Sequence, residues 1–83
     1  PTDADRASFE GSDGVQAMRL AEDLGQKDLF RIFALHLDDT LPTRAQGALL
    51  VDAIRGYGDQ DTSMKAARAL AQRGMILADR GYP

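Results

Sequence analysis

The segment from Leu29 to Leu37 constrains the fold of this chain more than any other part. Its large apolar residues are Leu29, Phe30, Ile32, Phe33, Leu35 and Leu37. On an α-helix these side chains cover roughly 220° of the circumference, about twice the stripe that a surface helix needs. We therefore expect a helix that packs on several sides, or one that keeps a side for a partner.

The size and composition of the chain are those of one small domain. A chain of 83 residues buries roughly 60–65% of its unfolded surface, so its fold is marginally stable alone and gains from a dimer. Hydrophobic residues make up 43% and charged residues 28% of the chain, as in an ordinary globular protein. No apolar run reaches the ~18 residues of a membrane-spanning helix, and no signal-peptide pattern opens the sequence.

Cysteine is absent, and this excludes disulfides, thiolate chemistry and cysteine-based metal sites. The absence fits a reducing compartment, so we predict a cytoplasmic location. The only histidine is His36, and a zinc site would then need three carboxylates or a symmetric partner. Ser8, Ser12 and Ser63 lack the strained turn that activates a nucleophilic serine. We therefore expect no metal, no cofactor and no enzymatic activity.

Apolar residues recur at helical spacing in four segments, which glycine or proline separates. The predicted helices cover residues 14–24, 27–38, 43–58 and 62–74. Residues 1–11 show no such periodicity and are rich in polar side chains, so we expect a mobile acidic arm there. Residues 12–83 then form a single helical domain. The predicted fold is an all-α compact bundle of four short helices, with helix 27–38 at its centre.

Two positions bear on where these helices begin and end. Thr43-Arg44-Ala45-Gln46 matches a capping box and is the strongest helix start in the chain. Gly74 leaves two interpretations of the last helix. Either the helix continues and Met75 extends its apolar stripe, or it stops and residues 75–77 become extended. Glycine inside a helix costs only ~1 kcal/mol relative to alanine, so we favour continuation.

The apolar excess of helix 27–38 predicts a protein-binding function. Its arc is wider than packing on one side requires, and two adjacent acids follow it at the helix end where negative charge is unfavourable. A partner would cover the excess apolar surface and neutralise the two acids. We therefore predict a non-enzymatic protein–protein interaction module, such as a small adaptor, regulator or inhibitor. The predicted contact residues are Phe30, Phe33, Leu37, Asp38 and Asp39.

The charge of the chain is unevenly distributed. Residues 1–42 hold nine acidic and four basic side chains, whereas residues 43–83 hold four acidic and six basic ones. An acidic half beside a basic half favours different partners on two faces, or head-to-tail self-association. The predicted partner is therefore another protein or a second copy of this chain. Neither a membrane nor a small-molecule substrate is indicated.

His36 falls within the apolar arc by helical phase, between Leu29 and Phe33. We favour a buried or half-buried histidine that donates to a backbone carbonyl. The functional alternative is a pH-sensitive contact, because burial lowers the pKa of a histidine and a neighbouring acid raises it.

DNA binding is the alternative function, because helices 43–58 and 62–74 follow one another roughly as in a helix-turn-helix, although the turn between them is long. In that motif the N-terminal polar residues of the second helix enter the major groove. The corresponding residues here are Thr62, Ser63, Lys65, Arg68 and Gln72. Against this alternative, the turn carries Asp59 and Asp61 and the net charge is −3. Phosphate contacts dominate DNA affinity, so protein binding remains the first prediction.

Overall fold

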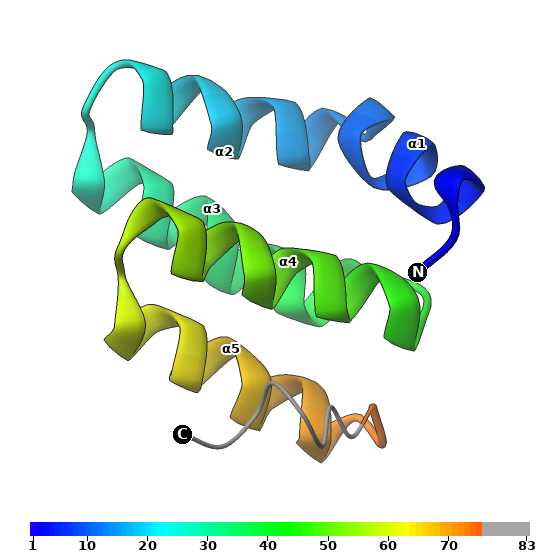
Figure 1. The fold of residues 1–83 in the computed structure, drawn as a ribbon. Coiled ribbons are helices and arrows are strands. Elements are labelled where there is room, and N and C mark those ends of the chain that lie inside the picture. The colour runs from blue at the N-terminus through cyan, green and yellow to red at the C-terminus, as the bar shows by residue number, and fades with distance from the viewer. Residues whose placement is uncertain (76–83) are drawn as a thin grey trace.

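The computed structural model describes residues 1–75, and every element in that range is a helix. The elements are α1 (Asp3–Gly11), α2 (Asp13–Asp23), α3 (Lys27–Thr40), α4 (Arg44–Tyr57) and α5 (Gln60–Gln72). From α2 onward the chain runs back and forth, while α1 precedes α2 along the same edge (Figure 1). The all-α prediction is confirmed, and the described residues form five helices rather than four.

Residues 1–11 contain helix α1, which corrects the prediction of an arm. A capping box holds its start: the backbone N–H of Asp5 donates to Oγ1 of Thr2 at 3.1 Å, and the backbone N–H of Thr2 donates to Oδ2 of Asp5 at 2.8 Å. The bonds from Thr2 also keep the pKa of Asp5 below its ordinary value. Phe9 is only 1% exposed, because α1 packs against α2 and α4 and carries this ring into the core.

The last described helix ends at Gln72, before Gly74, which has a left-handed φ of 86°. The N–H of Met75 donates to the carbonyl oxygen of Leu70 at 2.9 Å, which is the 6→1 hydrogen bond of a Schellman motif at a helix C-terminus. The predicted continuation of the helix through Gly74 is therefore wrong, because this bond turns the chain away from the helix axis. Residues from 76 onward lie outside the described part of the chain.

The turn between α2 and α3 is equally tight. Gly25 has a φ of 69°, and the N–H of Gln26 donates to the carbonyl oxygen of Ala21 at 2.9 Å. The two helices then pack closely along their length. A Cβ atom at Gly14 would lie only 2.8 Å from a methyl carbon of Leu37, so glycine permits this approach. The α2–α3 hairpin is thus a close-packed unit.

The core lies between the helices, with α3 and α4 at its centre. Helix α3 packs against α2, α4 and α5, and α4 packs against α1, α3 and α5. The ring of Phe30 on α3 meets that of Tyr57 on α4, with centroids 4.2 Å apart. The largest fully buried apolar side chains are Phe9, Phe30, Met18, Leu50, Ile54, Leu70, Val15 and Val51.

Candidate interaction surface

Large hydrophobic side chains remain exposed at four positions in residues 1–75, all on or directly after α2 or on α3. Their exposed fractions are 58% for Leu20, 64% for Leu24, 45% for Leu29 and 61% for Ile32. Single exposed hydrophobic residues are common on soluble proteins, so the significance of these four depends on whether they form a group. We call them the α2–α3 patch.

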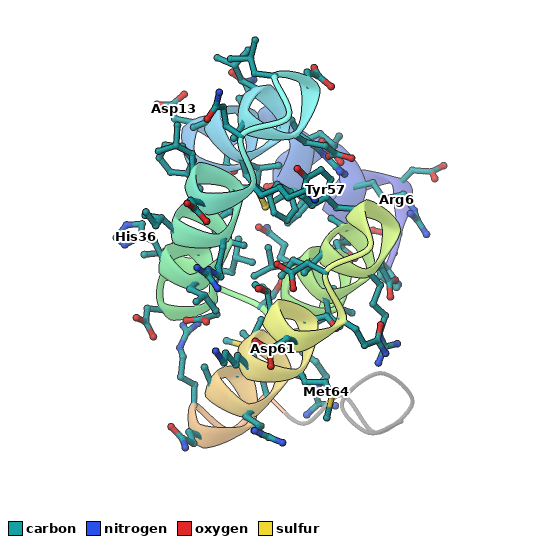
Figure 2. The ribbon with its side chains drawn as sticks, turned by 90° about the vertical axis from the view of Figure 1, so that its left-hand side faces the viewer. Arg6, Asp13, His36, Tyr57, Asp61 and Met64 are labelled. Carbon is teal, nitrogen blue, oxygen red and sulfur yellow. The ribbon has the colours of Figure 1, made fainter. Side chains whose placement is uncertain are left out.

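The members of the α2–α3 patch lie on one outer side of the hairpin. Both leucines from the α2 segment project within about 20° of the direction of Asp13, since they follow it by seven and eleven residues. The two members on α3 project within about 40° of His36 by the same reasoning. Figure 2 shows Asp13 and His36 on the same side of the molecule, away from Arg6. The patch therefore spans both helices of the hairpin.

The fold divides the five residues predicted to contact a partner. Phe30, Leu37 and Asp38 are buried, Phe33 is half-buried, and Asp39 is exposed. The three buried residues belong to the packed side of α3 and cannot form an outer contact surface, which corrects the prediction for them. The wide apolar arc of α3 serves two purposes: one part fills the core, and the part with Leu29 and Ile32 faces outward.

Sequence periodicity does not identify Leu20 and Leu24 as exposed. It places them on the same stripe of the helix as Met18 and Ala21, which the structure buries. The difference comes from α1, which also packs against α2 and moves the buried side of that helix toward Val15. A sequence prediction that does not include helix α1 therefore places the two leucines in the core.

Acidic side chains border the α2–α3 patch. The exposed acids on these two helices are Asp13, Asp23, Asp28 and Asp39. Asp28 lies 3.7 Å from Arg31, which helical phase places about 100° around α3 from Ile32. Arg31 and Lys27 line a hollow beside Tyr57 instead. Exposed acids on both helices create a negative potential around the apolar side chains.

Asp38 is held at the C-terminal end of α3 with only 4% exposure. Burial raises its pKa to about 6, and the charge of Asp39 and a hydrogen bond with it act in the same direction. The guanidinium of Arg73 opposes this rise in part. Arg73 also donates to the carbonyl oxygens of Asp38 at 2.6 Å and Leu41 at 2.9 Å, so it caps the end of α3.

His36 is exposed, which corrects the interpretation as a buried histidine. Together with Gly14 and Gln46 it lines a hollow of about 440 Å³ at the end of the hairpin away from Gly25. Two of its lining residues are linked across the helices, since Nε2 of the buried Gln46 donates to Oγ of Ser8 at 3.3 Å. A pH-sensitive role for His36 stays a prediction.

A second hollow, of about 480 Å³, lies between α1, α2 and α4. Arg19 bridges its wall, 2.8 Å from Glu10 and 3.3 Å from Glu22. The hydrogen bonds from Arg19 lower the pKa of Glu10. Arg19 thereby links α1, which carries Glu10, to α2 at the wall of this hollow.

The residues predicted to contact DNA are also divided. Thr62 and Ser63 are buried, where the Thr62 hydroxyl donates to Oδ2 of Asp59 at 2.6 Å and the Ser63 hydroxyl donates to the Gln60 carbonyl oxygen at 2.8 Å. Asp59 is the N-cap of α5, and the two residues lie buried in the first turn behind it. They cannot reach a DNA groove, which corrects the prediction for them. Lys65 is exposed and lies 3.1 Å from Asp61. Arg68 and Gln72 are exposed on the same helix.

Comparison with protein-family models, with curated proteins and with solved structures finds no match. Across residues 1–75, no three or more His, Cys, Asp or Glu side chains come together in a way that would hold a metal ion. In the same range, no helix has both the length and the apolar character to cross a membrane.

Proposed function

We propose that this protein is a non-enzymatic protein-binding module whose contact surface is the α2–α3 patch. The observation that carries the proposal is the grouping of all large exposed hydrophobic residues of the described chain on one side of one hairpin. Covering a half-exposed leucine or isoleucine contributes about 1 kcal/mol, so a partner that covers all four gains several kcal/mol. Phe33, half-buried beside the patch, and the exposed Asp39 remain contact candidates.

The geometry of the hairpin favours a preformed binding surface over a flexible segment. Helices α2 and α3 are joined by a tight turn and packed closely at Gly14, so the patch is presented on a rigid support. A rigid, preformed surface loses little conformational entropy when a partner binds. A cytoplasmic location remains a prediction that rests on the absence of cysteine.

Affinity capture with paired variants tests the proposal. The immobilised full chain is compared with the double variant Leu24→Gln, Ile32→Gln in an extract of the organism that makes it, with nuclease present. We expect a protein that the unchanged chain retains and the double variant loses. The matched control is Lys65→Gln, Arg68→Gln, which changes two exposed positions on α5 and should retain the same protein.

The same pair of variants separates the DNA-binding alternative. If the proposal is right, the unchanged chain does not bind duplex DNA at physiological salt, and neither do the two variant pairs. Binding to DNA that weakens with the α5 control pair and not with the α2–α3 pair would contradict the proposal and favour the helix-turn-helix alternative.

A further inference from the structure

The α2–α3 patch has two rows of hydrophobic side chains on two antiparallel helices. Leu20 and Leu24 are spaced four residues apart, and Leu29 and Ile32 three residues apart. Side chains at these spacings form ridges and grooves that accept the ridge of a third helix. A strand would gain less here, because helix backbones offer no free N–H and C=O groups with which it could pair. The shape of the patch therefore suits a helical partner.

The charges around the patch define the polar flanks of such a partner. On α3, Asp28, Ile32 and Asp39 project within about 40° of one another, so acids lie before and after the apolar residue on one line. On α2, Asp13 is in line with the two leucines, and the exposed Asp23 lies beside Leu20. A helix that covers the patch meets carboxylates on both flanks. Lysine or arginine there would form ion pairs and accelerate association.

The same charges disfavour the other candidates for the patch. In a symmetric dimer the surface meets a second copy of itself, so acids of one copy would face acids of the other. A phospholipid surface and a nucleic acid both present phosphates, which these acids would repel.

We infer that the α2–α3 patch binds a basic amphipathic helix of another protein, which places apolar residues between the two rows and lysine or arginine on both flanks. The inference rests on the proposed function and adds the chemistry of the partner. It predicts that hydrophobic contacts hold the complex together and that the acids select which amphipathic helix binds.

A displayed library of helical peptides tests this inference without a known partner. Each peptide is about 18 residues long, or five turns, with leucine or isoleucine along one stripe. The positions flanking the stripe encode lysine, glutamine or glutamate in equal proportion. Peptides are selected on the full chain and counted against those selected on Leu24→Gln, Ile32→Gln. We expect lysine to exceed glutamate by about two- to fivefold at flank positions that face an acid, as for exposed ion pairs.

Charge-reversal variants make the test specific for the acids. With Asp28→Lys, Asp39→Lys as the target, the selected flanks should change from lysine to glutamate. Asp61→Lys, an exposed acid on α5, is the matched control and should keep the lysine preference. Circular dichroism confirms that each variant is folded before selection.

The outcomes separate the inference from the proposed function. Peptides that require Leu24 and Ile32 but show no lysine preference would overturn the inference and leave the binding function supported. If no selected peptide requires these two residues, both are wrong. A dimer of the unchanged chain in sedimentation equilibrium that Leu24→Gln, Ile32→Gln converts to monomer would also overturn the inference, because a second copy would then occupy the patch.

Discussion

At the scale of single residues, the carboxyl group of Asp38 is held where water has little access. Its side chain is buried beneath the end of α3, next to a second carboxyl on Asp39. Desolvation and a neighbouring negative charge both disfavour ionisation, which explains the pKa of about 6. Arg73 reduces this cost and joins the end of α3 to the end of α5.

Replacement of Asp38 by asparagine is expected to stabilise the protein at neutral pH. The pKa in the folded state is about 6 and the ordinary value is 3.8, so the folded state holds the proton more tightly than the unfolded state. The contribution of Asp38 to stability is therefore fully present below its unfolded pKa and is lost as the pH rises through 6. Asp38→Asn should raise the free energy of unfolding by about 1–3 kcal/mol at pH ~7.5 and change it little at pH ~3.5.

Urea unfolding at the two pH values measures this difference. Asp23→Asn is the matched control, because Asp23 is also an acid at a helix C-terminus but is exposed. Its effect should stay within about 0.5 kcal/mol at both pH values. A loss of stability in Asp38→Asn at neutral pH would show that attraction to Arg73 outweighs the cost of burial.

Gly74 and Gly56 form a second residue-scale test. A Cβ atom at either position would meet nothing within 4 Å, so both positions have room for an alanine side chain. The two glycines differ in backbone conformation. Gly74 has a positive φ, whereas Gly56 lies within α4. Gly74→Ala should lower the free energy of unfolding by about 1 kcal/mol, and Gly56→Ala should raise it by up to about 1 kcal/mol. Thermal unfolding that moves in the same direction for both would contradict this assignment of the end of α5.

At the scale of elements, α1 decides which side of α2 is buried. Its capping box begins the helix at Thr2, and its packing places Phe9 in the core. The ion pair between Arg19 and Glu10 adds a second link between α1 and α2. The exposure of the α2 leucines is a consequence of this arrangement.

Truncation of Phe9 and of Leu20 to alanine tests the role of α1. Phe9→Ala should lower the free energy of unfolding by about 3–5 kcal/mol, because it leaves a cavity in the core. Leu20→Ala, at a position 58% exposed, should lower it by less than about 1 kcal/mol. Urea unfolding compares the two variants directly. An equal loss from both would mean that Leu20 is buried and does not belong to the α2–α3 patch.

At the scale of the whole molecule, stability is concentrated in the two helices that pack against three others. Helices α3 and α4 have this position, whereas the main contacts of α1 are with α2 and α4. The backbone hydrogen bonds of the central helices break only when the whole domain unfolds. Those of peripheral helices also break in smaller, local openings.

Native-state hydrogen exchange should reveal this ranking. We expect the slowest amide exchange at buried positions of α3 and α4, including Phe30, Ala34, Leu50 and Ile54. Amides of α1 should exchange faster, since α1 can open while the remaining helices stay packed. Protection in α1 that equals the protection in α4 would show that the five helices unfold as one cooperative unit.

The helical class and most helix positions follow from local sequence patterns. Apolar residues at helical spacing, the capping box at Thr43 and the glycine at position 58 specify these elements locally, and the structure agrees within a few residues. Such signals operate between residues three or four apart, so they can be recognised without a fold. The capping box formed by Thr2 and Asp5 is of the same kind and is the local signal for α1.

Which apolar side chains are buried depends on how the helices pack against one another. Helix α3 has an apolar arc too wide for one interface, and its sequence cannot say whether Phe30 or Ile32 faces the core. The packing of Phe30 against Tyr57, and of α1 against α2, settles this choice. The candidate contact surface is therefore a product of how helices distant in sequence pack, because burial depends on all the neighbours of a residue and helical phase depends on its own helix alone.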